Sequence, residues 1–167
     1  MRRFVRRVFA VTGLVAAAVL IPTRGRNETG LAAYVEQPMA LDLRNLPTEA
    51  LAFLTERHVA TLTTLRPDGS PHVVAIAFTF DPDEALVRII TGARSRKVRH
   101  ARRGGRAAVA QVDGPRWLSL EGPVRVTDDP ERVAEAVRRH SQRYREPGEN
   151  PERVAIEIEV ERILGRA

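Results

Sequence analysis

The chain has 167 residues, of which 43% are hydrophobic, enough for one ordinary domain with a buried core. It contains no cysteine, which excludes disulfides, thiolate nucleophiles and cysteine-ligated zinc or iron–sulfur sites. The net charge of +6 is concentrated in residues 1–38, where six arginines against two glutamates give +4 and leave +2 for residues 39–167. That nearly balanced remainder does not indicate a nucleic-acid-binding face.

The first residues form a basic run followed by a short apolar run that ends at Pro22. The apolar run is too short to span a bilayer comfortably, and no small-x-small cleavage site follows it. We therefore interpret residues 1–38 as a disordered leader or a mis-assigned start, with Met39 as the preferred start. A secretory signal or membrane anchor is the alternative. The expected product is a cytoplasmic protein whose folded domain spans residues 39–167.

Residues 48–57 follow Pro47 and predict a short amphipathic helix with Leu51, Leu54 and His58 on its inner face. The hydrophobic period then changes to two. Residues 59–65 and 71–80 predict a β-hairpin around an Arg-Pro-Asp-Gly-Ser turn, and residues 86–91 predict the third strand of a meander.

Residues 107–112 and 117–126 predict two more strands, with a bulge or bend at Gly122-Pro123. Asp129 and Pro130 start a helix favourably. Residues 154–160 alternate and predict a last strand with its glutamates in solvent. Six strands with short connections predict a mainly β (α+β) fold, a small antiparallel barrel with flanking helices.

The loop of residues 91–97 joins the third strand to a basic helix predicted from Arg96 to about Arg103. It holds Lys97, the only lysine in a chain whose other 26 basic residues are arginine. With Ser95 as the expected N-cap and Arg94, Arg96 and Lys97 around it, the loop predicts an anion cradle, and phosphate is the favoured anion. A solvated basic turn is the alternative interpretation.

Other motifs favour structural roles. His58, His72, His100 and His140 lie on four different predicted elements without ligand spacing, so no metal site is expected. No nucleophile-elbow pattern supports hydrolysis. Trp117, after a turn, is on pattern alone more often a packing anchor than a cofactor contact.

Five blocks in register resemble the split β-barrel flavin/deazaflavin oxidoreductases, the superfamily of the pyridoxamine-phosphate oxidases. Within it, the likeness is greatest to the mycobacterial branch that reduces biliverdin with the deazaflavin coenzyme F420. The resemblance covers roughly residues 46–164. The matching blocks are Thr63-Thr64-Leu65-Arg66, Ser70-Pro71-His72-Val73-Val74-Ala75, Phe78-Thr79-Phe80-Asp81-Pro82, Gln111–Gly114 with Arg116–Gly122, and Gln142-Arg143-Tyr144-Arg145.

The resemblance implies a six-stranded split barrel of the FMN-binding type and a homodimer with F420 bound between the barrels. It implies that Ser95, Arg96 and Lys97 hold the cofactor phosphate. The residues implied to contact the rest of the cofactor are His72, Val73, Val74 and Ala75 along the ring, Ile90, Thr91, Gly92, Ala93 and Arg94 along the ribityl chain, and Asp113, Gly114 and Trp117 from the other subunit. Glycine is expected at the Arg94 position, so Arg94 either adds a contact to an anionic tail or points outward.

The implied activity is hydride transfer from reduced F420 to a conjugated substrate, biliverdin or a related tetrapyrrole. Because a guanidinium meets a carboxylate bidentately, Arg116, Arg143 and Arg145 are candidates for binding the bilin propionates. No residue is assigned as the general acid. Two alternatives stay open, an FMN-dependent pyridoxine-phosphate oxidase-like enzyme and a non-catalytic flavin- or haem-binding protein, because a Ser-x-Lys cradle does not separate the two phosphates.

Overall fold

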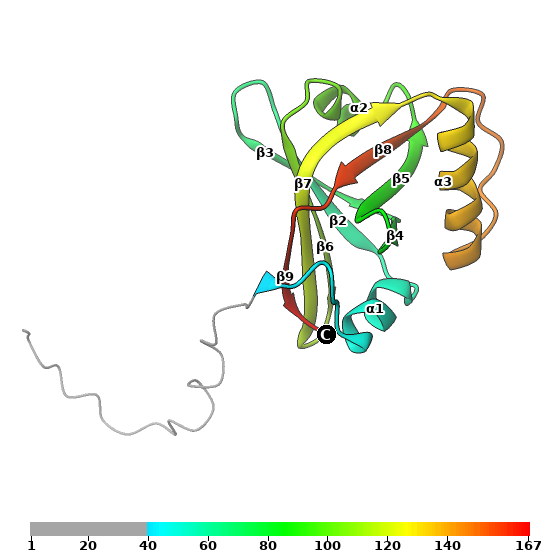
Figure 1. Ribbon diagram of the computed structural model, residues 1–167. Helices are drawn as coiled ribbons and strands as arrows, with labels where there is room; N and C mark the ends of the chain where they lie inside the picture. Colours follow the sequence, from blue (N-terminus) through cyan, green and yellow to red (C-terminus); the bar gives the residue numbers. More distant parts are fainter. Residues whose placement is uncertain (1–39) are drawn as a thin grey trace, which may run out of the picture. The chain divides into compact units, whose positions relative to one another are not determined.

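The computed structural model describes residues 40–167 (Figure 1). The expectations for the leader and for Met39 therefore lie outside the described residues. No helix among residues 40–167 is long and apolar enough to cross a membrane.

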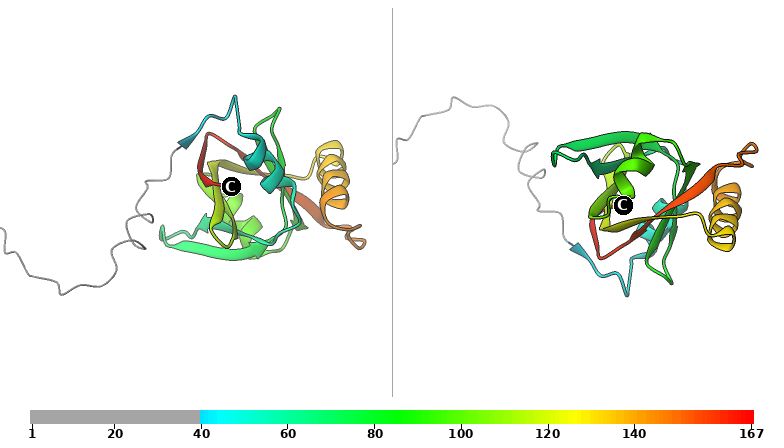
Figure 2. Two further views of the ribbon diagram at one scale, coloured as in Figure 1. Left: turned by 90° about the horizontal axis from the view of Figure 1, so that it is seen from below. Right: turned by 90° about the horizontal axis from the view of Figure 1, so that it is seen from above.

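Within residues 40–167, nine strands form one antiparallel sheet in the order β3-β2-β6-β7-β8-β5-β4, with β9 paired to β7 and β1 paired to β9. The strands are β1 (Ala40–Leu41), β2 (Ala60–Leu65), β3 (Pro71–Ile76), β4 (Thr79–Asp81), β5 (Leu86–Gly92), β6 (Arg106–Asp113), β7 (Arg116–Thr127), β8 (Arg153–Glu159) and β9 (Arg162–Arg166). In both views of Figure 2 the sheet curls around its core. Strands β3 and β4, at the two ends of the order, do not pair with each other, so the sheet is not closed.

The mainly β antiparallel prediction is confirmed, but the count of six strands is wrong. The run predicted as one strand over residues 71–80 is two strands, since β3 pairs with β2 and β4 pairs with β5. The chain leaves the ladder at Phe78, whose backbone bonds instead to the side chains of Arg143 and Tyr144. Strands β1 and β9 are short or interrupted by Gly165, so they carry little alternating pattern.

In the described part of the chain, three helices accompany the sheet: α1 (Thr48–Thr55), α2 (Arg96–Ala101) and α3 (Pro130–Arg143). The predicted start of α3 is confirmed, because Asp129 accepts a hydrogen bond from the backbone N–H of Arg132 at 2.9 Å and Pro130 occupies the first turn. Helix α1 buries Ala50, Phe53 and Leu54, not the predicted face with Leu51 and His58. Its true face has i, i+3, i+4 spacing and packs near β4.

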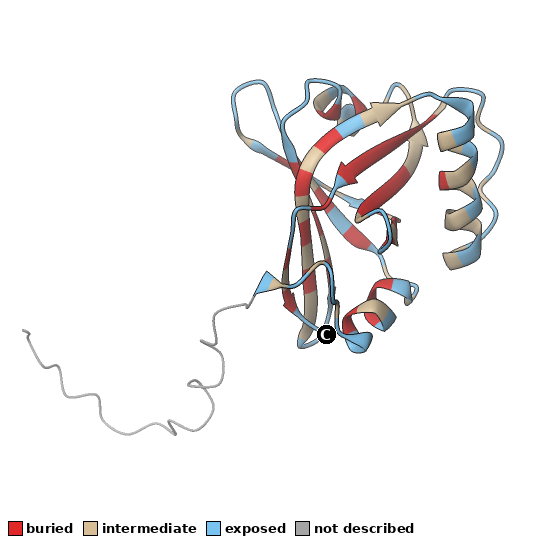
Figure 3. Ribbon diagram, in the orientation of Figure 1, coloured by how far each residue is buried: buried red, intermediate tan, exposed pale blue. Residues whose placement is uncertain are grey.

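The core lies inside the curl of the sheet, and Figure 3 shows it as buried segments along the strands. Its largest fully buried hydrophobic side chains come from α1, β2, the β3–β4 link and strands β5, β7, β8 and β9: Phe53, Leu62, Phe78, Val87, Ile89, Leu118, Leu120, Ile156, Ile158 and Ile163.

The prediction that the last strand turns its glutamates to solvent is wrong for Glu157. This residue is 0% exposed, and its carboxylate receives Arg125 at 2.9 Å and Arg132 at 2.8 Å. The reason is α3, which packs over β4, β5 and β8 and brings Arg132 onto the outer side of β8. When a strand is buried on both faces, the alternation of apolar and polar residues no longer shows which side chains face solvent.

Strand β7 changes partner at the predicted bend. Its first half pairs with β6 and β9, up to Pro123, and from Val124 onward it pairs with β8. At Gly122 the chain passes so close to the β8–β9 link that a Cβ atom would lie 1.7 Å from the carbonyl oxygen of Glu159. Only glycine fits there without moving backbone.

Replacing Gly122 by alanine should therefore destabilise the protein by about 2–4 kcal/mol, because backbone must shift to admit the methyl group. Urea unfolding measures this. Gly148→Ala is the matched control, since a Cβ at Gly148 meets nothing within 4 Å. Wild-type stability of Gly122→Ala would contradict the close contact.

Candidate functional site

The loop after β5 places the hydroxyl of Ser95 in an unusual position. Ser95 precedes α2 as predicted, but its side chain makes no capping hydrogen bond, and its Oγ is buried with no partner in the described chain. The helix ends at Ala101, short of the expected Arg103. With only six residues in α2, anion binding here must come mainly from side chains. A buried hydroxyl without a partner fits a site that a ligand oxygen completes.

Three basic side chains lie near His72 and the start of α2. Arg96 and Lys97 follow Ser95 in the first turn of α2, and Arg66 stands in the turn between β2 and β3. All three act on His72 of β3: burial first, then His100 and these cations lower the pKa of His72 below its usual value. The loop and β3 therefore lie in one positive region, as an anion cradle requires.

Strand β3 offers unpaired backbone along one edge. It ends the sheet order and pairs only with β2, so its other edge has no strand partner among residues 40–167. His72 and Val74 face α2 and the core, whereas Val73 and Ala75 face outward. The end of β5, from Ile90 to Gly92, likewise pairs with β8 alone. Free N–H and C=O groups at these edges are available to a planar ligand with polar ring edges.

Arg94 points away from the cradle. Its side chain is 86% exposed and forms an ion pair with Glu152, and the neighbouring Ala93 N–H donates to the carbonyl of Glu152 at 2.9 Å. Of the two expectations for Arg94, the outward one fits the structure.

The turn from Asp113 to Trp117 lies at the opposite end of β6 from α2. Strand β6 has eight residues and begins five residues after α2 ends, so about 25 Å separates its two ends. Within one copy of the chain, the structure does not bring Asp113, Gly114 and Trp117 together with Ser95 and Lys97.

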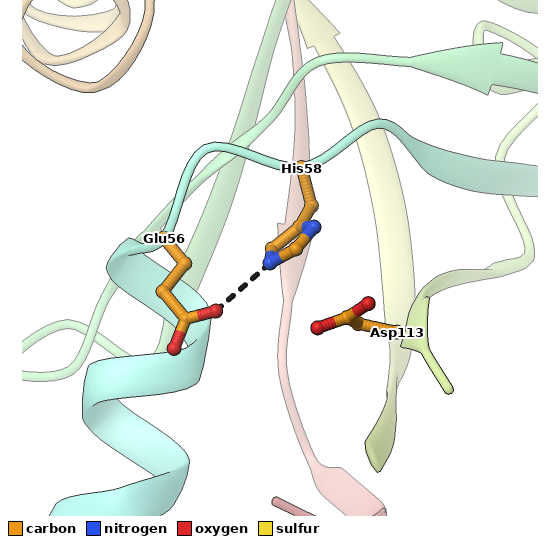
Figure 4. A group of neighbouring side chains, drawn as sticks. All are labelled: Glu56, His58 and Asp113. Atoms are coloured by element: carbon orange, nitrogen blue, oxygen red, sulfur yellow. Dashed lines mark hydrogen bonds and ion pairs between the residues drawn. The ribbon is translucent and has the colours of Figure 1, made fainter. Parts of the chain in front are cut away.

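Around this turn the structure assembles a cluster that the sequence analysis missed. Glu56, His58 and Asp113 offer ligand atoms within 4.8 Å of one another (Figure 4), and His58 Nε2 lies 2.8 Å from Glu56. Arg116, however, donates to both Glu56 oxygens at 2.8 and 2.9 Å and to Asp113 at 2.5 Å. Arg116 and His58 hold the pKa of Glu56 at about 2. The cation of this cluster is the guanidinium of Arg116.

Arg143, predicted to bind substrate, has a structural role instead. Its guanidinium donates to the carbonyls of Glu56 and Phe78 and to the side chain of Gln111, at 2.6–3.0 Å, and stacks over the Phe78 ring at 4.5 Å. With four hydrogen bonds already made inside the protein, its guanidinium has little capacity left for a carboxylate. Arg145, two residues on, is exposed.

Arg143→Ala should lower the free energy of unfolding by about 3 kcal/mol, because several buried acceptors lose their donor together. Thermal and urea unfolding check this. Arg145→Ala, on the exposed side of the same segment, should stay within about 0.5 kcal/mol of wild type. If Arg143→Ala kept full stability and only raised a substrate KM, the original assignment would be right.

These features describe a small antiparallel β-sheet protein with a basic, hydroxyl-bearing loop suited to an anionic ligand. A model of the pyridoxamine 5'-phosphate oxidase family matches residues 46–167. The match covers more than half of the chain, and the chain belongs to that family.

Individual relatives extend the comparison. The F420H(2)-dependent biliverdin reductase of Mycobacterium tuberculosis is 56% identical over 122 residues, covering 73% of this chain and 89% of the relative. A solved F420 reductase is 25% identical, with a TM-score of 0.58 over 71% of this chain and 98% of that chain. The haem storage protein HutZ from Vibrio cholerae, 14% identical, shares the fold alone, with a TM-score of 0.60 over 70% of this chain and 92% of its own.

Proposed function

We propose that this protein is an F420-dependent reductase whose substrate is biliverdin or a related tetrapyrrole. The observation that carries the proposal is the 56% identity to an F420H(2)-dependent biliverdin reductase, which extends over most of both chains. The solved F420 reductase with the same fold supports the choice of cofactor. The unpaired Ser95 hydroxyl and the adjacent Arg96 and Lys97 supply groups that such a phosphorylated cofactor needs.

In this proposal, Ser95, Arg96 and Lys97 bind the phosphate, and the free edges of β3 and β5 bind the ring and the ribityl chain. When bound, F420H2 supplies the hydride for the electrophilic carbon of the substrate. The protein contributes position and charge: Val73 and Ala75 shape the ring surface, and the cations fix the anionic end. A proton reaches the product from solvent or a nearby donor, and no side chain is assigned to that step.

A second copy of the chain completes the site in this proposal. The large hydrophobic residues that are exposed among residues 40–167 lie on the outer side of β2, β3 and β6 or, for Val59, just before β2. They are Val59, Leu65, Val73 and Val112. Small residues, among them Ala108 and Ala110, lie between them on the same face. An exposed apolar face of this kind is typical of a protein–protein interface. Pairing two such faces would let the Asp113–Trp117 turn of one copy approach the cofactor of the other.

Two of the three arginines predicted to bind substrate are kept as candidates in this proposal. Arg116 and Arg145 remain candidates for the propionates of a bilin. Arg116 is already paired with Glu56 and Asp113, so a propionate would have to replace one of these carboxylates. Residues 39–167 are proposed to be sufficient for binding and activity, and a cytoplasmic location stays a prediction.

Fluorescence titration tests the cofactor. Trp117 is the only tryptophan, and it lies on the half-buried outer side of β7, next to the proposed interface. Adding F420 should quench its emission saturably, and reduced F420 should then be oxidised by biliverdin. Tight FMN binding without any saturable response to F420 would overturn the proposal in favour of an FMN protein of the same family.

Lys97→Ala should weaken F420 binding by about 1.5–3 kcal/mol, the loss expected for a charge-assisted hydrogen bond. The melting temperature of the cofactor-free protein should stay almost unchanged, because Lys97 has no ion-pair partner among the described residues. Arg103→Ala, an exposed cation just beyond α2, is the matched control for charge. A large loss of stability in Lys97→Ala would make the lysine structural.

Ala110→Glu tests the interface. Ala110 lies between Thr61 and Ser119 on the outer face of the sheet, so glutamates would meet in a dimer and prevent its formation. Sedimentation should show a dimer for wild type and a monomer for the variant, with F420 binding weakened. Ala134→Glu, on the exposed side of α3, should remain dimeric. A monomeric wild type would contradict this part of the proposal.

A further inference from the structure

Two histidines meet behind the cradle. His72, on the inner side of β3, is 9% exposed, and its ring lies edge-on to the ring of His100 of α2, with centroids 4.6 Å apart and planes at 83°. The two rings come from elements that are separated in the sequence by strands β4 and β5. Neither has a carboxylate hydrogen-bonded to it among the described residues, although a carboxylate is the common partner of a buried histidine.

The hydrogen bonds of this pair are incomplete. His72 Nδ1 is buried and has no partner in residues 40–167. His100 Nδ1 lies 3.4 Å from Thr64 Oγ1, and Thr64 stands directly opposite His72 in the β2–β3 register. Buried polar atoms without partners destabilise a protein, so they are usually satisfied by a ligand or water. Ser95 Oγ, beside Arg96, is in the same condition.

The charges that act on His72 are all positive. Arg66 lies in the β2–β3 turn, and Arg96 and Lys97 lie on α2. Asp68, the acidic residue of that turn, accepts from the backbone N–H and the hydroxyl of Ser70. Together with burial and with His100, the three cations lower the pKa of His72, which is therefore neutral at pH 7 in the cofactor-free protein. An anion placed among the cations would offset them and reverse this effect.

We propose that His72 is a further anion-binding residue, and that it takes up a proton when the phosphate of F420 binds beside Ser95 and Lys97. This inference rests on the proposed function. It assigns the imidazole of His72 to the phosphate end of the cofactor, in addition to the backbone contact expected for the ring. The proton converts a neutral acceptor into a charged donor next to the ligand.

The linkage has a definite sign. Protons bound with the anion make the complex more stable as pH falls, by at most tenfold in affinity per pH unit for one full proton. In the cofactor-free protein, the effect of pH on folding stability has the opposite sign. Because the pKa of His72 is lower in the folded state than in the unfolded state, the free energy of unfolding decreases as pH falls through the unfolded value near 6.5. Binding and folding therefore respond in opposite directions to the same group.

Calorimetric titration with oxidised F420 tests the inference in wild type and in His72→Asn, which keeps a hydrogen-bonding group near the Nδ1 position but does not titrate. Buffers with different ionisation enthalpies give the number of protons taken up. Wild type should take up more protons than the variant near pH 7. Between pH 8 and pH 6 its affinity should rise about tenfold more than that of the variant. Protons that F420 itself gains or loses are common to both proteins and cancel.

His140→Asn is the matched control. His140 is also partly buried, but it lies on α3 and stacks on Tyr144, so its replacement should leave the proton uptake of wild type unchanged. If His72→Asn fails to fold, NMR titration of the four histidines in wild type decides the question, because F420 should raise the pKa of His72.

The outcomes separate the two claims. F420 binding with the same pH dependence in wild type and His72→Asn, or an unchanged pKa of His72 in the complex, would overturn this inference and leave the proposed function intact. Absence of F420 binding at every pH would overturn both.

Discussion

The close passage of β7 under the β8–β9 link is the constraint on which the rest of the structure depends. Because β7 pairs with β6 and β9 before Gly122 and with β8 after it, one strand joins both halves of the sheet. The Glu121 carbonyl accepts from the Glu161 N–H at 2.9 Å, which locks the crossing. The curl that encloses the core, and with it the separation of the two sheet ends, follows from this crossing.

The open sheet leaves the free strand edge and positions the polar groups that form the candidate site. Among residues 40–167, strand β3 has no strand partner along one edge, and the loop after β5 brings a hydroxyl and two cations to the same positive region. A second set of polar contacts holds the opposite end together: Gln111, fully buried, donates to the Phe53 carbonyl at 2.6 Å and accepts from Arg143 at 2.7 Å. Arg143 is therefore bonded within the protein, whereas Ser95 Oγ has no hydrogen-bond partner among the described residues.

Local signals in the sequence were sufficient where neighbours in the chain determine structure. The β2–β3 hairpin, the Asp129-Pro130 helix start and the start of α2 at Arg96 were all predicted correctly. The residue pattern gave wrong predictions where a residue's contact partner is distant in the sequence. Phe78 leaves the ladder because Arg143, 65 residues away, takes its carbonyl, and Glu157 is buried because α3 supplies Arg132. The Glu56–His58–Asp113 cluster was missed for the same reason, since Asp113 arrives on another hairpin.

A crystal structure of the protein with F420 tests the central claim most directly. The account predicts two copies joined through the outer face of β2, β3 and β6, with the cofactor phosphate within hydrogen-bond distance of Ser95 Oγ and Lys97 Nζ. A phosphate bound elsewhere, with the residue 91–97 loop turned to bulk solvent, would contradict it.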